Sequence, residues 1–207
     1  MRIAILIFDR LTALDAIGPY EVLSRIPGAK LAFVAKEPGM KRTDTDRLGI
    51  NADLGIADIP DPDIVLVPGG EGNRPLMIDD EVLDWVRTAH EASTWTTSVC
   101  TGALVLGAAG ILDGKRATTH WAYLDRLREL GAEPVAERVV EDGKIVTGAG
   151  VSAGIDMALT LASRVAGDKV AQAIQLGIEY DPKPPFDTGS PDKASAELVD
   201  LIRSSEG

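Results

Sequence analysis

Cysteine and histidine are scarce in this sequence, which has one cysteine and two histidines among its 207 residues. A lone cysteine has no disulfide partner within the chain, which is typical of a protein from a reducing compartment. We therefore expect a cytoplasmic protein. The three residues also lack the close pairwise spacing of a structural zinc site, so no metal is expected.

The sequence also lacks long hydrophobic runs, and it has fewer basic than acidic residues. The longest uncharged apolar run, residues 102–112, is far shorter than the roughly 18 residues that cross a bilayer. The apolar N-terminal run is too short for a signal peptide and has no small-residue cleavage site. Lys and Arg number 21 against 32 Asp and Glu, and the net charge of −11 offers no attractive field to a phosphate backbone. We expect neither a membrane nor a nucleic-acid partner.

The rest of the composition, 45% hydrophobic and 26% charged, is that of a globular protein, and the length fits one domain over residues 1–207. Short β-branched runs alternate with segments of helical periodicity, which predicts an α/β fold with a mostly parallel sheet. Strands are expected at residues 3–8, 30–35, 64–67 and 95–99, with a hairpin over residues 138–147; helices are expected at residues 81–87, 101–109, 123–130 and 152–166. Residues 38–62 form an irregular edge. The Pro-rich tail, residues 181–207, is expected to be extended up to a short helix near residues 194–202.

The most informative stretch is residues 95–104 (WTTSVCTGAL), where a strand runs into Cys100 and a helix follows at once. This is the pattern of a nucleophile elbow, and Gly102 removes a Cβ that would collide with the neighbouring strand. The start of a helix favours a thiolate, so the pKa of Cys100 is expected well below the ordinary value of about 8.5. Alternatively Cys100 is a small buried hydrophobic residue, but its place at the junction favours a nucleophile.

Asp15 is the carboxyl expected at the same edge of the sheet. Pro19 favours a helix that starts near Gly18, which would leave Asp15 in the preceding loop. An equally good interpretation is a capping box formed by Thr12 and Asp15.

Gly69 and Gly70 follow the third strand, where their amides could form an oxyanion hole or merely an ordinary turn. His120 could act as a base for Cys100 or serve a structural purpose. Residues 148–153 match G-x-G-x-x-A, but they lie near the end of the sheet and do not open a βαβ unit. No dinucleotide cofactor is therefore expected.

Residues 98–104 (SVCTGAL), followed by residues 117–121 (ATTHW), resemble the ThiJ/PfpI superfamily. Further similarity lies in residues 14–19, 68–70, 154–158 and 179–191. The combination is similar to the isocyanide (isonitrile) hydratase branch. Many superfamily members carry His after the nucleophile and Glu in the first loop, where this sequence has Thr101 and Asp15, as that branch does.

The resemblance implies a flavodoxin-like three-layer sandwich, a homodimer, a small-molecule substrate and no cofactor. It also implies water addition to an isocyanide, with Cys100 as nucleophile, Asp15 as acid and base, and Thr101 as their hydrogen-bonding neighbour. Substrate binding would fall to Gly69, Gly70 and Val151. We expect the tail from Tyr180 to Pro191 to pack on folded protein. Two alternatives stay open: a glyoxalase- or deglycase-like enzyme using the same cysteine, and a redox or ligand sensor.

Overall fold

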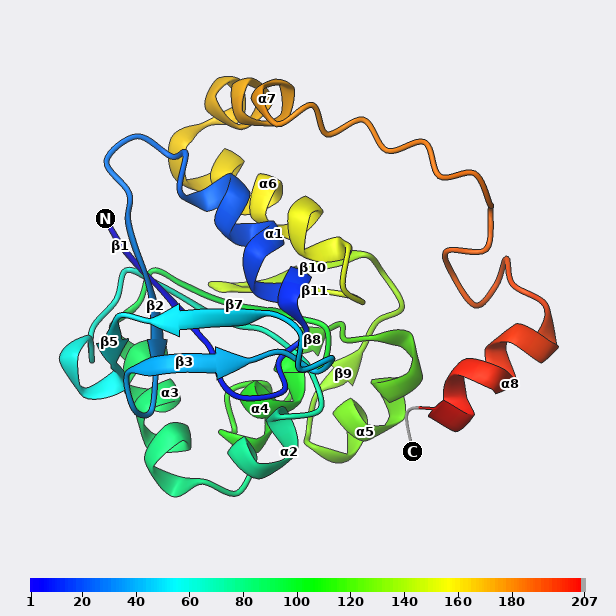
Figure 1. Cartoon of the computed structure of the whole chain (residues 1–207), viewed down its shortest axis with the longest axis horizontal. Coiled ribbons are helices and arrows are strands. Elements are labelled where there is room, and N and C mark those ends of the chain that lie inside the picture. The colour runs from blue at the N-terminus through cyan, green and yellow to red at the C-terminus, as the bar shows by residue number, and fades with distance from the viewer. Residues whose placement is uncertain (206–207) are drawn as a thin grey trace.

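A seven-stranded sheet lies at the centre of the structure, a computed structural model that describes residues 1–205 (Figure 1). Its strands lie in the order β10-β11-β7-β6-β1-β2-β5, and every pairing is parallel except that of β10 with β11. These strands are β1 (Arg2–Leu6), β2 (Lys30–Ala35), β5 (Leu54–Gly55), β6 (Ile64–Val67), β7 (Trp95–Val99), β10 (Val139–Asp142) and β11 (Ile145–Gly148). The alternation of strand and helix in the sequence therefore predicted the sheet correctly.

The central strands are continuous apolar runs because helices cover both of their faces. All four residues of β6 are buried, and so are Ile3 to Leu6 of β1. α1 packs on α6 over one face of the sheet, while α3 and α4 cover the other. The helices are α1 (Ala13–Leu23), α2 (Asn73–Leu76), α3 (Asp80–Ala92), α4 (Gly102–Ala108), α5 (Leu124–Glu129), α6 (Ala153–Ala166), α7 (Asp168–Gly177) and α8 (Ala196–Ser205). The three layers confirm the expected flavodoxin-like sandwich.

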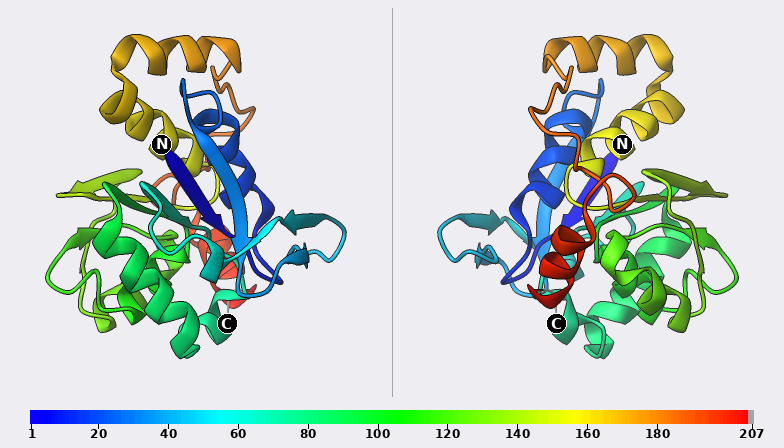
Figure 2. Two further views of the ribbon diagram at one scale, coloured as in Figure 1. Left: turned by 90° about the vertical axis from the view of Figure 1, so that its left-hand side faces the viewer. Right: turned by 90° about the vertical axis from the view of Figure 1, so that its right-hand side faces the viewer.

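The edge segments are more regular than expected. Residues 38–62 contain an antiparallel hairpin of β3 (Gly39–Arg42) and β4 (Gly49–Ala52), which projects from one side of the molecule (Figure 2). A second small sheet, β8 (Arg116–Ala117) with β9 (Glu133–Pro134), was not predicted, and neither was α7. No helix within residues 1–205 is both long and apolar enough to cross a bilayer.

The expected start of the first helix near Gly18 was wrong. α1 begins at Ala13 and keeps Pro19 in its interior, so Asp15 lies in its first turn. Pro19 removes one helical hydrogen bond, but α1 packs tightly on α6: a Cβ at Gly18 would lie 3.1 Å from Ile155, and one at Gly154 would lie 3.3 Å from Pro19. This tertiary packing stabilises the helix beyond what its local sequence would.

The C-terminal arm, residues 181–205, extends away from the layers before α8 (Figure 1). Phe186 is 76% exposed, and Leu198, Leu201 and Ile202 are exposed on α8. Tyr180 donates a hydrogen bond to Asp156 at 2.8 Å, and Arg203 lies 5.6 Å above the Trp121 ring. Tyr180 therefore packs on α6 as expected, whereas residues 181–189 are exposed and do not pack on their own chain. Residues 206–207 of the predicted tail lie outside the described residues.

Candidate active site

Cys100 occupies a strained turn between β7 and α4. Its φ of 56° is positive, which is rare for a residue with a side chain and typical of a nucleophile elbow. The Cys100 amide donates to the carbonyls of Gly148 (3.1 Å) and Ala149 (2.8 Å), and Thr119 Oγ1 donates to the Cys100 carbonyl at 2.8 Å. These hydrogen bonds hold the backbone in a conformation that would otherwise be unfavourable.

Gly102 allows the elbow to approach β6. A Cβ at this position would lie 2.0 Å from the carbonyl oxygen of Val67 on that neighbouring strand. No side chain fits in this space. The predicted steric role of the glycine is confirmed.

Cys100 is only 6% exposed. Burial and the negative charge of Asp15 raise the pKa of Cys100, whereas the backbone N–H groups of Thr101 and Val151 lower it. The expectation of a depressed pKa was therefore wrong, because loss of hydration outweighs the field of a helix only seven residues long. Proton removal from Cys100 requires a nearby base.

Asp15 interacts with the Cys100 side chain, and it is completely buried. Burial raises the pKa of Asp15 to about 7, against the lowering effects of the Gly69 N–H group and the Cys100 side chain. Oδ2 accepts a hydrogen bond from Gly69 N at 3.0 Å, whereas Oδ1 has no hydrogen-bond partner within residues 1–205. The capping box does not form, because the Thr12 hydroxyl donates to Asp44 instead. A buried carboxyl that interacts with a thiol and keeps one oxygen without a partner is suited to proton transfer.

Thr101 is held beside this pair by two contacts. Its Oγ1 accepts from Gly70 N at 3.0 Å, and its carbonyl accepts from the buried Asn73 amide at 2.9 Å. The hydroxyl hydrogen of Thr101 remains available to donate. Sequence reasoning missed Asn73, because nothing in its neighbourhood indicates a contact 28 residues away.

The two glycines of the 68–70 loop support side chains and do not form an oxyanion hole. The Gly69 amide donates to Asp15 and the Gly70 amide donates to Thr101, so neither is free for a substrate oxygen. A Cβ at Gly69 would lie within 2.6 Å of Thr101, which explains the glycine at that position. Gly69 thus lies behind Asp15 and Thr101, while Gly70 borders the cleft.

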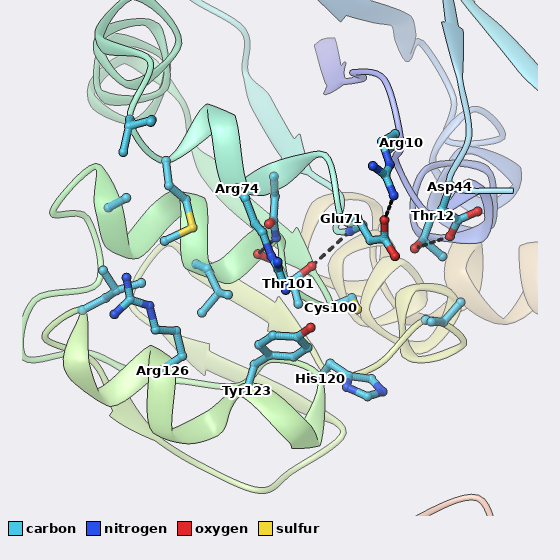
Figure 3. A pocket seen from close by; sticks show the side chains of 18 residues that line it. Arg10, Thr12, Asp44, Glu71, Arg74, Cys100, Thr101, His120, Tyr123 and Arg126 are labelled. Carbon is cyan, nitrogen blue, oxygen red and sulfur yellow. Dashed lines mark hydrogen bonds and ion pairs between the residues drawn. The ribbon is translucent and has the colours of Figure 1, made fainter. Parts of the chain in front are cut away.

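An open cleft of about 860 Å³ leads to Cys100 (Figure 3). The residues that line the cleft include Gly70, Thr101, His120 and Val151, together with Cys100 itself. His120 lies against Gly150, and its ring is tilted against the rings of Trp121 and Tyr123, with ring centroids 5.4 and 6.1 Å away. Within residues 1–205, no three His, Cys, Asp or Glu side chains are arranged to hold a metal ion.

The model of the DJ-1/PfpI family matches residues 1–164. This chain belongs to the DJ-1/PfpI family. The resemblance to the ThiJ/PfpI superfamily is thereby confirmed.

Individual DJ-1/PfpI proteins are similar over most of the chain. An isonitrile hydratase of Pseudomonas putida is 48% identical over 203 residues, which are 98% of this chain and 89% of that protein. The crystal structure of a ThiJ/PfpI family protein from Pseudomonas syringae superimposes with a TM-score of 0.95 at 35% identity, covering 99% of this chain and 85% of the other. Drosophila melanogaster DJ-1beta shares the fold. Its crystal structure superimposes with a TM-score of 0.80 at 22% identity, covering 87% of this chain and 98% of its own.

Proposed function

We propose that this protein is an isonitrile hydratase, which adds water to an isocyanide R–N≡C and releases the N-substituted formamide R–NH–CHO. The observation that carries the proposal is the 48% identity, over 98% of the chain, to the isonitrile hydratase of Pseudomonas putida. The buried Cys100 and Asp15 pair supports it, because this reaction needs a nucleophile and a proton carrier but no leaving group.

In the first half of the proposed reaction, the Cys100 sulfur bonds to the terminal carbon of the isocyanide. Asp15 takes the thiol proton and delivers it to the same carbon, giving the thioimidate R–N=CH–S–Cys100. One proton moves from sulfur to carbon, so the pair needs no proton from outside. Because its pKa is raised to about 7, the Asp15 carboxylate is a stronger base than an ordinary carboxylate, which suits it to take up the thiol proton.

In the second half, Asp15 removes a proton from water as the oxygen attacks the thioimidate carbon, and it passes that proton to the nitrogen. The carbon–sulfur bond of the resulting R–NH–CH(OH)–S–Cys100 then breaks. The hydroxyl proton returns to the Cys100 and Asp15 pair as the formamide leaves. The hydration is redox-neutral, so the proposal includes no cofactor and one small-molecule substrate.

The Thr101 hydroxyl is proposed to donate a hydrogen bond during the reaction. This hydroxyl accepts from Gly70 N, which directs its hydrogen toward other acceptors such as Asp15 or the substrate nitrogen. The Val151 and Thr101 amides stabilise the sulfur when it carries negative charge. Gly69 and Gly70 keep Asp15 and Thr101 in position, and Gly70 and Val151 also border the substrate.

We further propose that the chain acts as one domain in a cytoplasmic homodimer. The exposed apolar side chains of the arm, with Phe186 76% exposed, support a contact with a second copy. Sedimentation of a monomer at micromolar concentration would contradict the homodimer.

Turnover of a simple alkyl isocyanide, measured as formamide production, tests the proposed function. Wild type is expected to turn over, and Cys100→Ala to produce no formamide above the uncatalysed rate. Methylglyoxal serves as the competing substrate. Turnover of methylglyoxal without formamide production would contradict the proposal and favour the glyoxalase-like alternative.

A further inference from the structure

The cleft is much larger than the reacting group of an isocyanide requires. Its volume of about 860 Å³ is within the range of sites that enclose a drug-sized ligand, roughly 300–1,000 Å³. The N≡C group fills only the end at Cys100. The remaining space is therefore available to the R group.

An apolar strip extends from Cys100 along α4. Leu104 and Ala108 lie four and eight residues after Cys100, so they share one helix face, and both line the cleft. At about 1.5 Å of rise per residue, Ala108 is about 6 Å beyond Leu104 along the helix axis. Met77 and Ile78 also line the cleft, and Ile78 is 83% exposed.

The charged side chains near the other end of the cleft already have partners, and Arg74, which also lines the cleft, is not free either. Arg10 forms an ion pair with Glu71, and Thr12 donates a hydrogen bond to Asp44 at 2.9 Å, both on the side opposite Tyr123 and Arg126 (Figure 3). Arg126, at the far end of the apolar strip, forms an ion pair with Glu129 at 2.6 Å. A charged R group would have to compete with these partners, whereas an apolar R group gains contact with Leu104 and Ala108.

We infer that the substrates are isocyanides with an elongated, uncharged, apolar R group, which lies along α4 from Cys100 past Leu104 to Ala108. This inference rests on the proposed function and specifies its substrate class. Each methylene that leaves water for the strip should raise kcat/KM about two- to fourfold until the cleft is filled.

The test is a series of straight-chain isocyanides from ethyl to octyl, with a carboxylate-bearing isocyanide of matched length. Wild type is expected to show kcat/KM rising with chain length, and the carboxylate compound is expected to be poorer than its alkyl counterpart. Ala108→Phe should fill the far end of the strip and lower the octyl-to-ethyl ratio of kcat/KM at least tenfold. Ala92→Phe, at an exposed position at the end of α3, is the matched control and should keep the wild-type ratio.

Equal kcat/KM values across the series, or a preference for the carboxylate compound, would overturn the inference and leave the hydratase proposal intact. Absence of turnover with every isocyanide would remove the proposed function itself and the inference with it. The chain-length series in wild type decides the matter even if Ala108→Phe fails to fold.

Discussion

The elbow around Cys100 and the C-terminal arm differ in how strongly their surroundings constrain each residue. At the elbow a Cβ on Gly102 would lie 2.0 Å from a neighbouring carbonyl, and both Cys100 and Asp15 are buried. In the arm a Cβ on Gly189 would have nothing within 4 Å, and Phe186 is 76% exposed. Substitutions at the elbow should therefore change chemistry and stability strongly, and substitutions in the arm should change the fold of one chain little.

Asp15→Asn should have the largest effect. Asn keeps the hydrogen bond from Gly69 N but cannot carry the proton between Cys100 and the substrate, so kcat should fall by about 10²–10⁴. Isocyanide turnover with a thermal melt of the same sample measures this. Activity close to wild type in the variant would show that Asp15 is not the proton carrier.

The same variant should change the pH dependence of stability. The pKa of Asp15 is raised from 3.8 to about 7 in the folded state, so its favourable contribution is complete below pH 4 and is lost as the pH rises through about 7. Wild type should therefore lose stability relative to Asp15→Asn between pH 4 and pH 8, by an amount on the order of 4 kcal/mol. Urea unfolding of both proteins across this range measures the difference. A constant difference would contradict the raised pKa.

The elbow and the arm can be compared most directly by the same substitution at Gly102 and at Gly189. Gly102→Ala should lower the free energy of unfolding by about 3 kcal/mol or more, because the backbone of the elbow or of β6 must move to admit the methyl group. Gly189→Ala should change it by less than about 0.5 kcal/mol. Urea unfolding of the two variants measures both effects. Similar losses in the two would remove the distinction between elbow and arm.

Phe186→Ser should have the smallest effect on a single chain. Because Phe186 is exposed, the free energy of unfolding should change by less than about 0.5 kcal/mol, measured at dilutions where sedimentation shows a monomer. The same substitution should weaken the proposed self-association at higher concentration. A large loss of monomer stability would mean that Phe186 packs on its own chain.

The parts of the site that sequence predicted well are those that steric constraints determine. A strand, a cysteine and then Gly102 leave almost no other local geometry, and the elbow and the parallel sheet were both found as expected. The helix start near Gly18 was wrong because packing of α1 on α6 outweighs the local effect of Pro19. A local sequence pattern does not show how deeply a residue is buried. The predicted direction of the Cys100 pKa shift was therefore wrong. Asn73 was missed for a similar reason, because its partner is distant in sequence.

The pH profile of kcat/KM for isocyanide hydration tests most directly whether Cys100 and Asp15 share one working proton. The active free enzyme should carry one proton on the pair, so kcat/KM should rise as the pH increases through about 7 and then level off. In Asp15→Asn the residual activity should lack this rise. A wild-type rate that falls as the pH increases through 7, or a rise that persists unchanged in Asp15→Asn, would contradict the shared proton.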